Sequence, residues 1–262
     1  MSVTNPFDLR GKSFLIVGGA GYLGLPACKL LAELGASLVI ADRDEPLLEA
    51  AGRALRDATP EACVTLRTVE VGDESSVTQL VEDTIKTHRR LDGMVNAVAT
   101  ASGMSFDDLT AEALERANKV NLSGFFLLAR SAAEAMNDGG SVVLLSSMYG
   151  MVAPDPRMYE PPMEPNPVEY GIAKAGILQM VRYMAAHYGP RNIRFNAIAP
   201  GPFPHPNGLN TAEFVQRLAD RTMLGRVGEQ DEIAGSIAFL LSSASTYMTG
   251  QCLTVDGGWT AW

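Results

Sequence analysis

Seven short runs of almost wholly apolar residues recur along the chain, with longer stretches between them. They lie at 13–17, 37–41, 64–71, 93–99, 141–145, 193–199 and 252–255. Strands buried on both faces have this composition, whereas strands with one wet face alternate apolar and polar residues. The pattern therefore predicts strands of a sheet that is covered on both sides.

Helical spacing is found between these runs. Apolar residues recur three and four positions apart in three sets: Leu30, Leu31 and Leu34; Val77, Leu80, Val81 and Ile85; Ile177, Met180, Val181 and Met184. We expect Asp73 and Thr110 to be helix N-caps, and Pro26 to lie close to the start of the first helix. Alternating strands and helices predict one α/β domain over residues 1–262, with a parallel sheet of about seven strands and helices on both faces.

Composition excludes several classes of function. The chain has 262 residues, of which 21 are basic and 30 acidic, so a net charge of -9 argues against nucleic acid as a partner. We find neither a secretory signal nor 18 consecutive apolar residues, and so expect no membrane association.

Cys28, Cys63 and Cys252 are far apart and lack metal-ligand spacing. We therefore expect reduced thiols, no metal site and a soluble, cytoplasmic protein.

A glycine-rich turn, "GGAGYLG", follows the first apolar run. Gly18, Gly21 and Gly24 would let the backbone turn tightly and approach a pyrophosphate at the start of a helix. Asp42 ends the second strand 18 residues after Gly24, where a carboxylate accepts bonds from ribose hydroxyls and repels a 2′-phosphate. Arg43 could hold that phosphate instead. The sequence favours a Rossmann-type, doubly wound fold that binds NAD, with NADP second and a solvated turn that binds nothing as the alternative.

One tyrosine meets the requirement for acid–base chemistry. A phenol has a pKa near 10, and using it at neutral pH requires a neighbouring cation. Lys174 stands four residues after Tyr170 in "YGIAK", on the same face of a helix. No lysine stands at that spacing after Tyr149, Tyr159 or Tyr183. A hydroxyl of Ser146 or Ser147, at the end of the fifth strand, could hydrogen-bond a substrate oxygen while the phenol exchanges its proton.

The chain resembles the short-chain dehydrogenase/reductase family over nearly its whole length. The motifs occur in the family's order: the glycine turn, Asp42, "VNLSG", the serine pair, "YGIAK", "IRFNAIAPGP" and "TGQCLTVDGG". The resemblance implies Ser147 as the catalytic hydroxyl, Tyr170 as general acid/base, Lys174 as its electrostatic partner and a ligand of the nicotinamide ribose, and Asn121 as holder of a relay water. The alternatives are that Ser147 caps a strand end and that Asn121 satisfies backbone groups in its helix.

The same resemblance implies a set of cofactor-binding residues and a homotetramer, whose helices around 110–136 and 168–189 would pair between subunits. The cofactor set is Gly18, Gly21, Tyr22, Leu23, Gly24, Asp42, Arg43, Glu70, Val71, Asn96, Ala97, Tyr170, Lys174, Pro200, Gly201 and Phe203.

The chain departs from the family pattern at four places. Its glycine spacing is similar to that of the extended branch, which includes sugar-nucleotide epimerases, although the chain ends in "VDGG" as the short branch does. "NAVA" replaces the usual Asn-Asn-Ala-Gly after the fourth strand. Glu70 ends the third strand where aspartate is common. His205 stands where a threonine is often found, and it faces either substrate or solvent.

A proline-rich insertion at about 151–168 separates Ser147 from Tyr170. Its prolines are Pro154, Pro156, Pro161, Pro162, Pro165 and Pro167, which restrict the backbone and predict a rigid wall beside the site. We expect polar side chains here to contact a hydroxylated or charged substrate: Tyr149, Arg157, Glu160, Glu164 and Asn166. The alternative is a surface excursion or subunit contact. Similar insertions are known in a subgroup linked to bacterial surface-sugar and flagellin modification.

The sequence thus predicts an NAD-dependent oxidoreductase that interconverts a secondary alcohol and a ketone, acting on a sugar-like substrate. The glycine spacing favours a second class, an epimerase or dehydratase of a sugar derivative that uses NAD transiently. The altered "NAVA" loop favours a third, a cofactor-sensing protein without catalysis. Trp259 and Trp262 at the C-terminal end either close a neighbouring subunit's site or pack within the chain.

Overall fold

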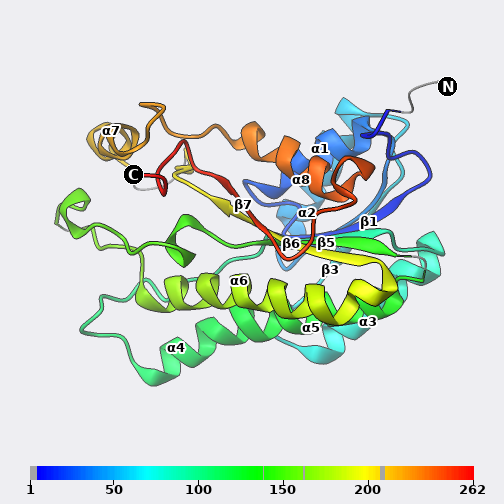
Figure 1. Ribbon diagram of the computed structural model, residues 1–262, viewed down its shortest axis with the longest axis horizontal. Helices are drawn as coiled ribbons and strands as arrows, with labels where there is room; N and C mark the ends of the chain where they lie inside the picture. The colour runs from blue at the N-terminus through cyan, green and yellow to red at the C-terminus, as the bar shows by residue number, and fades with distance from the viewer. Residues whose placement is uncertain (1–4, 138, 162, 207–209) are drawn as a thin grey trace.

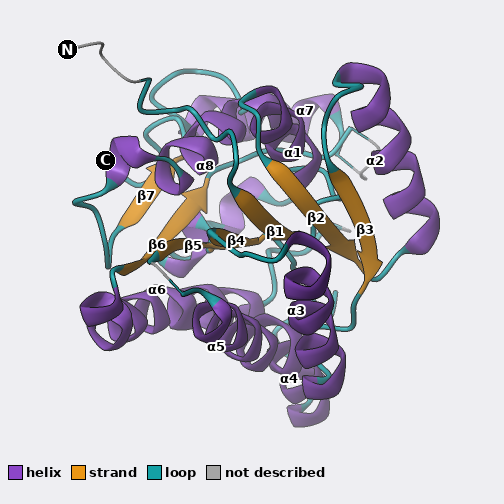
Figure 2. Cartoon of the chain, turned by 90° about the vertical axis from the view of Figure 1, so that its right-hand side faces the viewer, coloured by secondary structure: helices purple, strands orange, loops and turns teal. Residues whose placement is uncertain are grey.

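A single parallel sheet forms the centre of the protein. The structure, a computed structural model, describes residues 5–137, 139–161, 163–206 and 210–262 (Figure 1). Within that part of the chain, seven strands lie in the order β3-β2-β1-β4-β5-β6-β7, and every neighbouring pair is parallel (Figure 2). The strands are β1 (Ser13–Val17), β2 (Ser37–Asp42), β3 (Val64–Thr68), β4 (Gly93–Asn96), β5 (Gly140–Leu145), β6 (Ile193–Pro200) and β7 (Cys252–Val255). The predicted fold class is confirmed.

Helices cover both faces of the sheet, as Figure 2 shows. One layer holds α3 (Glu74–His88), α5 (Phe125–Ala135) and α6 (Val168–Tyr188), with α4 (Ala111–Asn118) packed against α6. The other holds α1 (Gly24–Glu33), α2 (Glu45–Ala58) and α8 (Ala234–Leu241). Each layer encloses its own apolar core against the sheet. The remaining helix, α7 (Ala212–Arg221), lies beyond the sheet, above the proline-rich insertion (Figure 1).

Two strands are shorter than the apolar runs predicted. The runs at 64–71 and 93–99 overestimated β3 and β4, which end at Thr68 and Asn96. Thr68 pairs with Asp42, the last residue of β2, and the amide of Val69 donates to the Asp42 carbonyl (3.1 Å) where that strand ends. At Asn96 the side-chain oxygen accepts a hydrogen bond from the amide of Val98 (3.2 Å), which turns the chain away from the sheet. Apolar composition continued past both points, but strand pairing did not.

The predicted helix starts are confirmed. Asp73 accepts a hydrogen bond from the amide of Ser76 (3.0 Å), and Thr110 accepts one from Ala113 (3.2 Å). Pro26 is the third residue of α1, where an amide would have no partner inside the helix. The proline therefore removes no helical hydrogen bond.

In the described ranges, none of the helices combines the length and apolar character needed to cross a bilayer.

Candidate active site

The carboxyl ends of the parallel strands meet at one edge of the sheet, and the sequence-predicted residues gather there. Chain order reverses between β1 and β4, which opens a crevice at that edge. A cavity of about 400 Å³ occupies it, and we call it the first cavity. It is lined by Gly18, Gly21, Tyr22, Leu23, Gly24, Asp42, Arg43, Asp44, Leu47, Val69, Glu70, Val71, Ala97, Val98, Ala99, Thr100 and Val120.

The glycine turn forms the floor of the first cavity. Gly18 has φ +76°, and a Cβ on it would lie 2.9 Å from the carbonyl carbon of Ala97. A Cβ on Gly24 would overlap the carbonyl oxygen of Gly18, so neither position has room for a side chain. No side chain caps α1 at Leu23, and the first turn of that helix contains no acid. The start of α1 therefore offers its amides to an anionic group such as a diphosphate.

Carboxylates stand at the far end of the first cavity. Asp42 accepts hydrogen bonds from the amides of Arg43 (2.8 Å) and Asp44 (3.4 Å), which hold it at the end of β2. Glu70 lies two residues after β3, and its Oε1 accepts from the amide of Gly72 (3.3 Å). Both side chains line the cavity with Arg43 beside them. The residues present fit an adenosine dinucleotide, with the diphosphate at α1 and the ribose near Asp42.

Asn96 lies beneath the first cavity and does not line it. Its side chain is fully buried, its oxygen holds the Val98 amide, and its nitrogen has no partner among the described residues. It acts on the loop after β4, whose residues Ala97 and Val98 face the cavity.

Tyr170 and Lys174 lie one turn apart on α6, close to the end of β5. Lys174 is almost fully buried, and its Nζ donates to the carbonyl oxygen of Leu145 (2.8 Å). The same nitrogen lies 5.5 Å from the centre of the Tyr170 ring and 4.9 Å from that of Phe125. Burial lowers the pKa of Lys174 to about 7, since it penalises the charged amine. The carbonyl and the two rings oppose that penalty.

The two serines after β5 have different partners. Ser146 donates its hydroxyl hydrogen to the carbonyl oxygen of Lys174 (2.7 Å), so its side chain braces α6 against the strand. Burial raises the pKa of the Tyr170 phenol, and hydrogen bonding from the Ser147 side chain lowers it by a smaller amount. The net pKa of Tyr170 lies above its usual value. Ser146 thus acts on the backbone of α6, and Ser147 acts on the Tyr170 phenol.

Asn121 lies in a π-helical segment, Lys119–Gly124, between α4 and α5. Its Oδ1 accepts from the amide of Thr100 (3.0 Å), and its Nδ2 donates to the carbonyl of the same residue (2.7 Å). Both side-chain atoms therefore hold the loop after β4, on the wall of the first cavity.

A second cavity, of about 560 Å³, opens beside Ser147 and Tyr170. Its lining is mostly apolar and aromatic, with a few polar side chains: Gly103, Met104, Ser147, Met148, Tyr149, Tyr159, Met163, Glu164, Pro165, Asn166, Pro167, Tyr170, Gly201, Pro202, Phe203, Pro204, Asn210, Phe214 and Leu218. Of the residues expected to contact substrate, Ser147, Tyr149, Glu164 and Asn166 are present. The insertion contributes one wall of this cavity; Pro162 lies outside the described residues.

Three expected substrate residues are not part of that lining. Arg157 pairs with Asp155 (2.7 Å) on the surface, and Glu160 pairs with Arg217 (2.9 Å) of α7. The ring of His205 lies 4.7 Å from that of Tyr22 in the glycine turn. His205 thus lies at the rim of the first cavity, and its carbonyl oxygen accepts a hydrogen bond from the side chain of Asn210 (3.1 Å), which lines the second cavity.

The outer end of the insertion is anchored to α7 and the C-terminal segment. Arg217 donates to the carbonyl of Met158 (2.8 Å), and Phe214 packs against Tyr159 with ring centres 5.4 Å apart. Trp259 is 4% exposed in the same cluster. The tryptophan therefore packs within its own chain.

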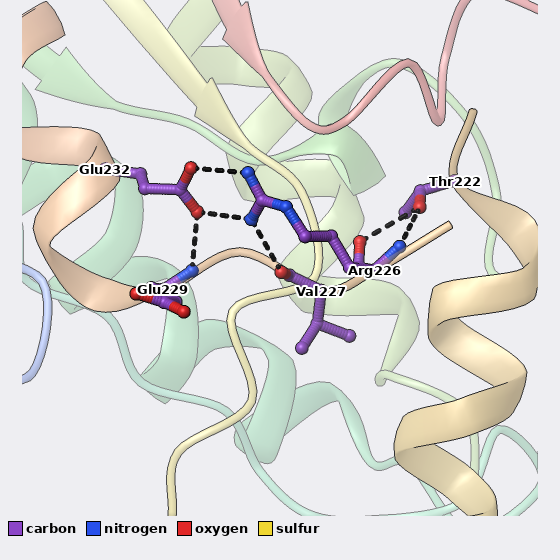
Figure 3. A network of polar contacts seen from close by, with 5 residues as sticks. All are labelled: Thr222, Arg226, Val227, Glu229 and Glu232. Carbon is purple, nitrogen blue, oxygen red and sulfur yellow. Dashed lines mark hydrogen bonds and ion pairs between the residues drawn. The ribbon is translucent and has the colours of Figure 1, made fainter. Parts of the chain in front are cut away.

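A polar network, shown in Figure 3, stabilises the turn that follows α7. Both terminal nitrogens of Arg226 bind the carboxylate of Glu232 at 2.7 Å, and that carboxylate also accepts from the amide of Glu229 (2.9 Å). At the other end, the hydroxyl of Thr222 donates to the carbonyl oxygen of Arg226 (2.9 Å) and accepts from its amide (3.2 Å). The turn is held at both ends.

This network fixes the loop after β6. The amide of Gly228, inside the held turn, donates to the carbonyl of Pro202 (2.9 Å). A Cβ on Gly228 would lie 2.5 Å from the ring of Phe203. The turn therefore supports Phe203 from behind, on the wall of the second cavity.

Sequence reasoning missed several lining residues. Phe214 and Leu218 lie four positions apart on α7, and that spacing on an otherwise polar helix was a readable signal. Met104, Met148 and Asn210 carried no comparable signal, since Met104 and Asn210 come from irregular segments and Met148 from a three-residue 3-10 helix. Glu169, also missed, is fully buried directly before Tyr170, and its Oε1 accepts from the amide of Ser102 (2.9 Å).

Fold and site together define a nicotinamide-dependent oxidoreductase acting on CH–OH groups. The chain belongs to the short-chain dehydrogenase/reductase family. The family model that matches it, over residues 21–260, is described as enoyl-(acyl carrier protein) reductase. The predicted family and enzyme class are confirmed.

Relatives and solved structures extend over the whole chain. The chain is 35% identical to cis-4-hydroxycyclohexanecarboxylate dehydrogenase of Sinomonas cyclohexanicum, covering 94% of this chain and 96% of the relative. It is 30% identical to galactitol 2-dehydrogenase (L-tagatose-forming) of Cereibacter sphaeroides, with 100% of both chains covered. A short-chain dehydrogenase of Leptospira borgpetersenii, solved with bound NAD+, superimposes with a TM-score of 0.87 at 26% identity, over 99% of this chain and 97% of that one.

Proposed function

We propose that this protein is an NAD-dependent dehydrogenase that interconverts a secondary alcohol and a ketone on a hydroxylated substrate. The observation that carries the proposal is the contact of Ser147 with Tyr170 in the lining of the second cavity, beside Lys174, whose Nζ lies 3.5 Å from the carbonyl oxygen of Val98 in the lining of the first. A substrate in the second cavity would meet both hydroxyls, and a dinucleotide in the first would end near them.

Each member of the group has a separate role in this proposal. Ser147 donates a hydrogen bond to the substrate oxygen and holds the alcohol carbon in place. Tyr170, as phenolate, takes the hydroxyl proton during oxidation and returns it during reduction. Lys174, held by the Leu145 carbonyl, stabilises the phenolate when its amine is charged. A bound nicotinamide supplies the hydride acceptor or donor.

Asn121 has a positioning role. Its two bonds to Thr100 keep the loop after β4 in place against the first cavity. Asn96 supports the same loop from below through Val98.

NAD is preferred over NADP in this proposal. Asp42 and Glu70 both line the ribose end of the first cavity, and two carboxylates disfavour a 2′-phosphate there. Arg43 is the one cation among the residues lining the cavity within the described part of the chain. The Leptospira neighbour holds NAD+.

The relatives' names and the second cavity together favour a ring alcohol or polyol as substrate. One relative is named for a hydroxylated cyclohexane ring and another for a polyol. The cavity offers apolar side chains for the ring carbons and hydroxyl, amide and carboxylate groups for substituents. The oxidoreductases among the relatives argue against the epimerase that the glycine spacing suggested, and the contact of Ser147 with Tyr170 argues against a sensor without catalysis.

In this proposal the insertion at about 151–168 acts as the substrate loop, since its residues form one wall of the second cavity.

The proposed assembly is a homotetramer built on the layer of α4, α5 and α6. In support, that layer exposes apolar and aromatic side chains: Phe126, Ile172 and Tyr183. Size-exclusion chromatography with light scattering tests the tetramer.

The deciding experiment measures NADH formation from NAD and a panel of cyclic alcohols, polyols and sugars, with NADP in parallel. We expect turnover with NAD on hydroxylated ring or chain substrates. Absence of turnover on every alcohol, in protein that binds NAD, would overturn the proposal.

A further inference from the structure

A pair of hydrogen-bonded tyrosines lies in the wall of the second cavity. The hydroxyl oxygens of Tyr149 and Tyr159 are 2.8 Å apart, and both residues line the cavity. Tyr149 belongs to the short 3-10 helix Met148–Gly150 after β5, whereas Tyr159 lies inside the proline-rich insertion. The pair therefore joins the insertion to the catalytic end of β5.

Tyr149 is held close to Ser147, the expected catalytic hydroxyl. Its amide donates to the hydroxyl of Ser147 (3.1 Å), and its side chain is 8% exposed. Burial raises the pKa of Tyr149 above its usual range, which favours the protonated hydroxyl. The distance between Ser147 and the tyrosine pair is thus set by a single turn of chain.

The tyrosine pair keeps one hydroxyl hydrogen and several lone pairs that a ligand can use. Two phenols carry two hydroxyl hydrogens, and their mutual bond uses one. Among the described residues, neither hydroxyl has a further hydrogen-bond partner. Whichever tyrosine donates, the other keeps a hydrogen for a group in the cavity. The oxygens also keep lone pairs, so the pair can both donate and accept.

The charge of the cavity limits what that group can be. No lysine or arginine occurs among its described lining residues, and the one ionisable acid or base besides the tyrosines is Glu164. A carboxylate or phosphate in this cavity would lose hydration without gaining a cation. A neutral hydroxyl would instead find a donor and an acceptor in the tyrosine pair.

We propose that the Tyr149–Tyr159 pair binds a second, non-reacting hydroxyl of an uncharged diol or polyol whose first hydroxyl is oxidised at Ser147 and Tyr170. This inference rests on the proposed function and adds the part of the substrate that is recognised. It assigns the insertion a role in selecting diols over simple alcohols and over hydroxy acids.

The test compares wild-type protein with the double variant Tyr149→Phe/Tyr159→Phe. Removing both hydroxyls leaves no buried polar group unpaired, so the wall keeps its shape. The substrates are cyclohexane-1,4-diol, cyclohexanol and 4-hydroxycyclohexanecarboxylate, each with NAD. The matched control is Tyr247→Phe, which removes a hydroxyl from a fully exposed tyrosine.

We expect wild-type protein to prefer the diol over cyclohexanol, and the double variant to lose about five- to tenfold of that preference, chiefly through KM. Tyr247→Phe should keep the preference. Equal losses on both alcohols, an unchanged preference, or a wild-type preference for the hydroxy acid would each overturn the inference.

Binding is measured separately from turnover. Calorimetric titration of NAD-loaded protein with the same compounds should show tighter binding of the diol to wild type than to the double variant. If no alcohol is turned over while this binding difference is present, the proposed function fails and the tyrosine site stands. If turnover occurs but the binding difference is absent, the tyrosine site fails and the dehydrogenase stands.

Discussion

Ser146 donates its hydroxyl hydrogen to the main-chain carbonyl of Lys174 at 2.7 Å, while its neighbour Ser147 bonds the phenol of Tyr170. Adjacent identical side chains therefore have separable effects. We expect Ser147→Ala to lower kcat by at least about 100-fold, because a donor to the substrate oxygen is lost. Ser146→Ala should cost about 1 kcal/mol of stability and leave kcat within a few-fold. Steady-state kinetics and thermal unfolding of both variants test this, and similar kcat losses in the two would contradict it.

Removal of the phenol hydroxyl should stop the chemistry and spare the cofactor. Tyr170→Phe is expected to lower kcat by about 10²- to 10⁴-fold, since proton transfer loses its acid and base. NAD affinity, followed by quenching of tryptophan fluorescence, should change little. Tyr247→Phe, which removes a hydroxyl from a fully exposed tyrosine, is the control. Turnover retained in Tyr170→Phe would remove Tyr170 from the mechanism.

The carboxylate at the end of β2 should set the cofactor preference. Asp42→Asn removes one negative charge from the first cavity, and the ratio of kcat/KM for NAD over NADP should fall by about tenfold or more. Asp57→Asn makes the same charge change on the exposed face of α2. An equal shift in both variants would mean that net charge, and not Asp42, sets the preference.

Burial of Lys174 predicts a pH dependence of stability. Its pKa is lowered from 10.5 to about 7 in the folded chain. Between these values the unfolded chain binds a proton that the folded chain does not, so this group makes stability rise with pH across the window. Lys174→Met removes the titration. The Tm difference, wild type minus variant, should therefore increase from about pH 7 to about pH 10. A flat or falling difference in the cofactor-free protein would show that the amine stays charged when buried.

Glu169 should act through the loop that it holds. Its Oε1 accepts from Ser102, and Gly103 and Met104, the next residues, line the second cavity. Glu169→Gln keeps an acceptor and should keep KM, whereas Glu169→Leu leaves the Ser102 amide unpaired. The leucine variant should lose about 1–3 kcal/mol of stability and show a raised KM for the alcohol. A raised KM in both variants would place the effect on charge and not on the hydrogen bond.

Local sequence was enough to predict the sheet, because buried parallel strands are apolar without interruption. Their ends at Thr68 and Asn96 were not predictable, since they depend on where neighbouring strands stop. Tyr170 and Lys174 were readable because a helix fixes residues four apart. Residues of the second cavity were not: Tyr159 reaches Tyr149 through a loop, and Arg157 and Glu160 turn outward to Asp155 and Arg217. Polarity alone does not tell which way a loop side chain points.

The proline-rich insertion leaves the chain directly after the turn that carries Tyr149 and rejoins it at Pro167, the N-cap of α6. Both ends are anchored to elements that also carry Ser147 and Tyr170, and its middle packs on α7. Ser147 and Tyr170 are therefore positioned by β5 and α6, outside the segment itself. We expect that changing the sequence of this stretch would alter which substrate fits the second cavity and would leave the groups that exchange the proton in place.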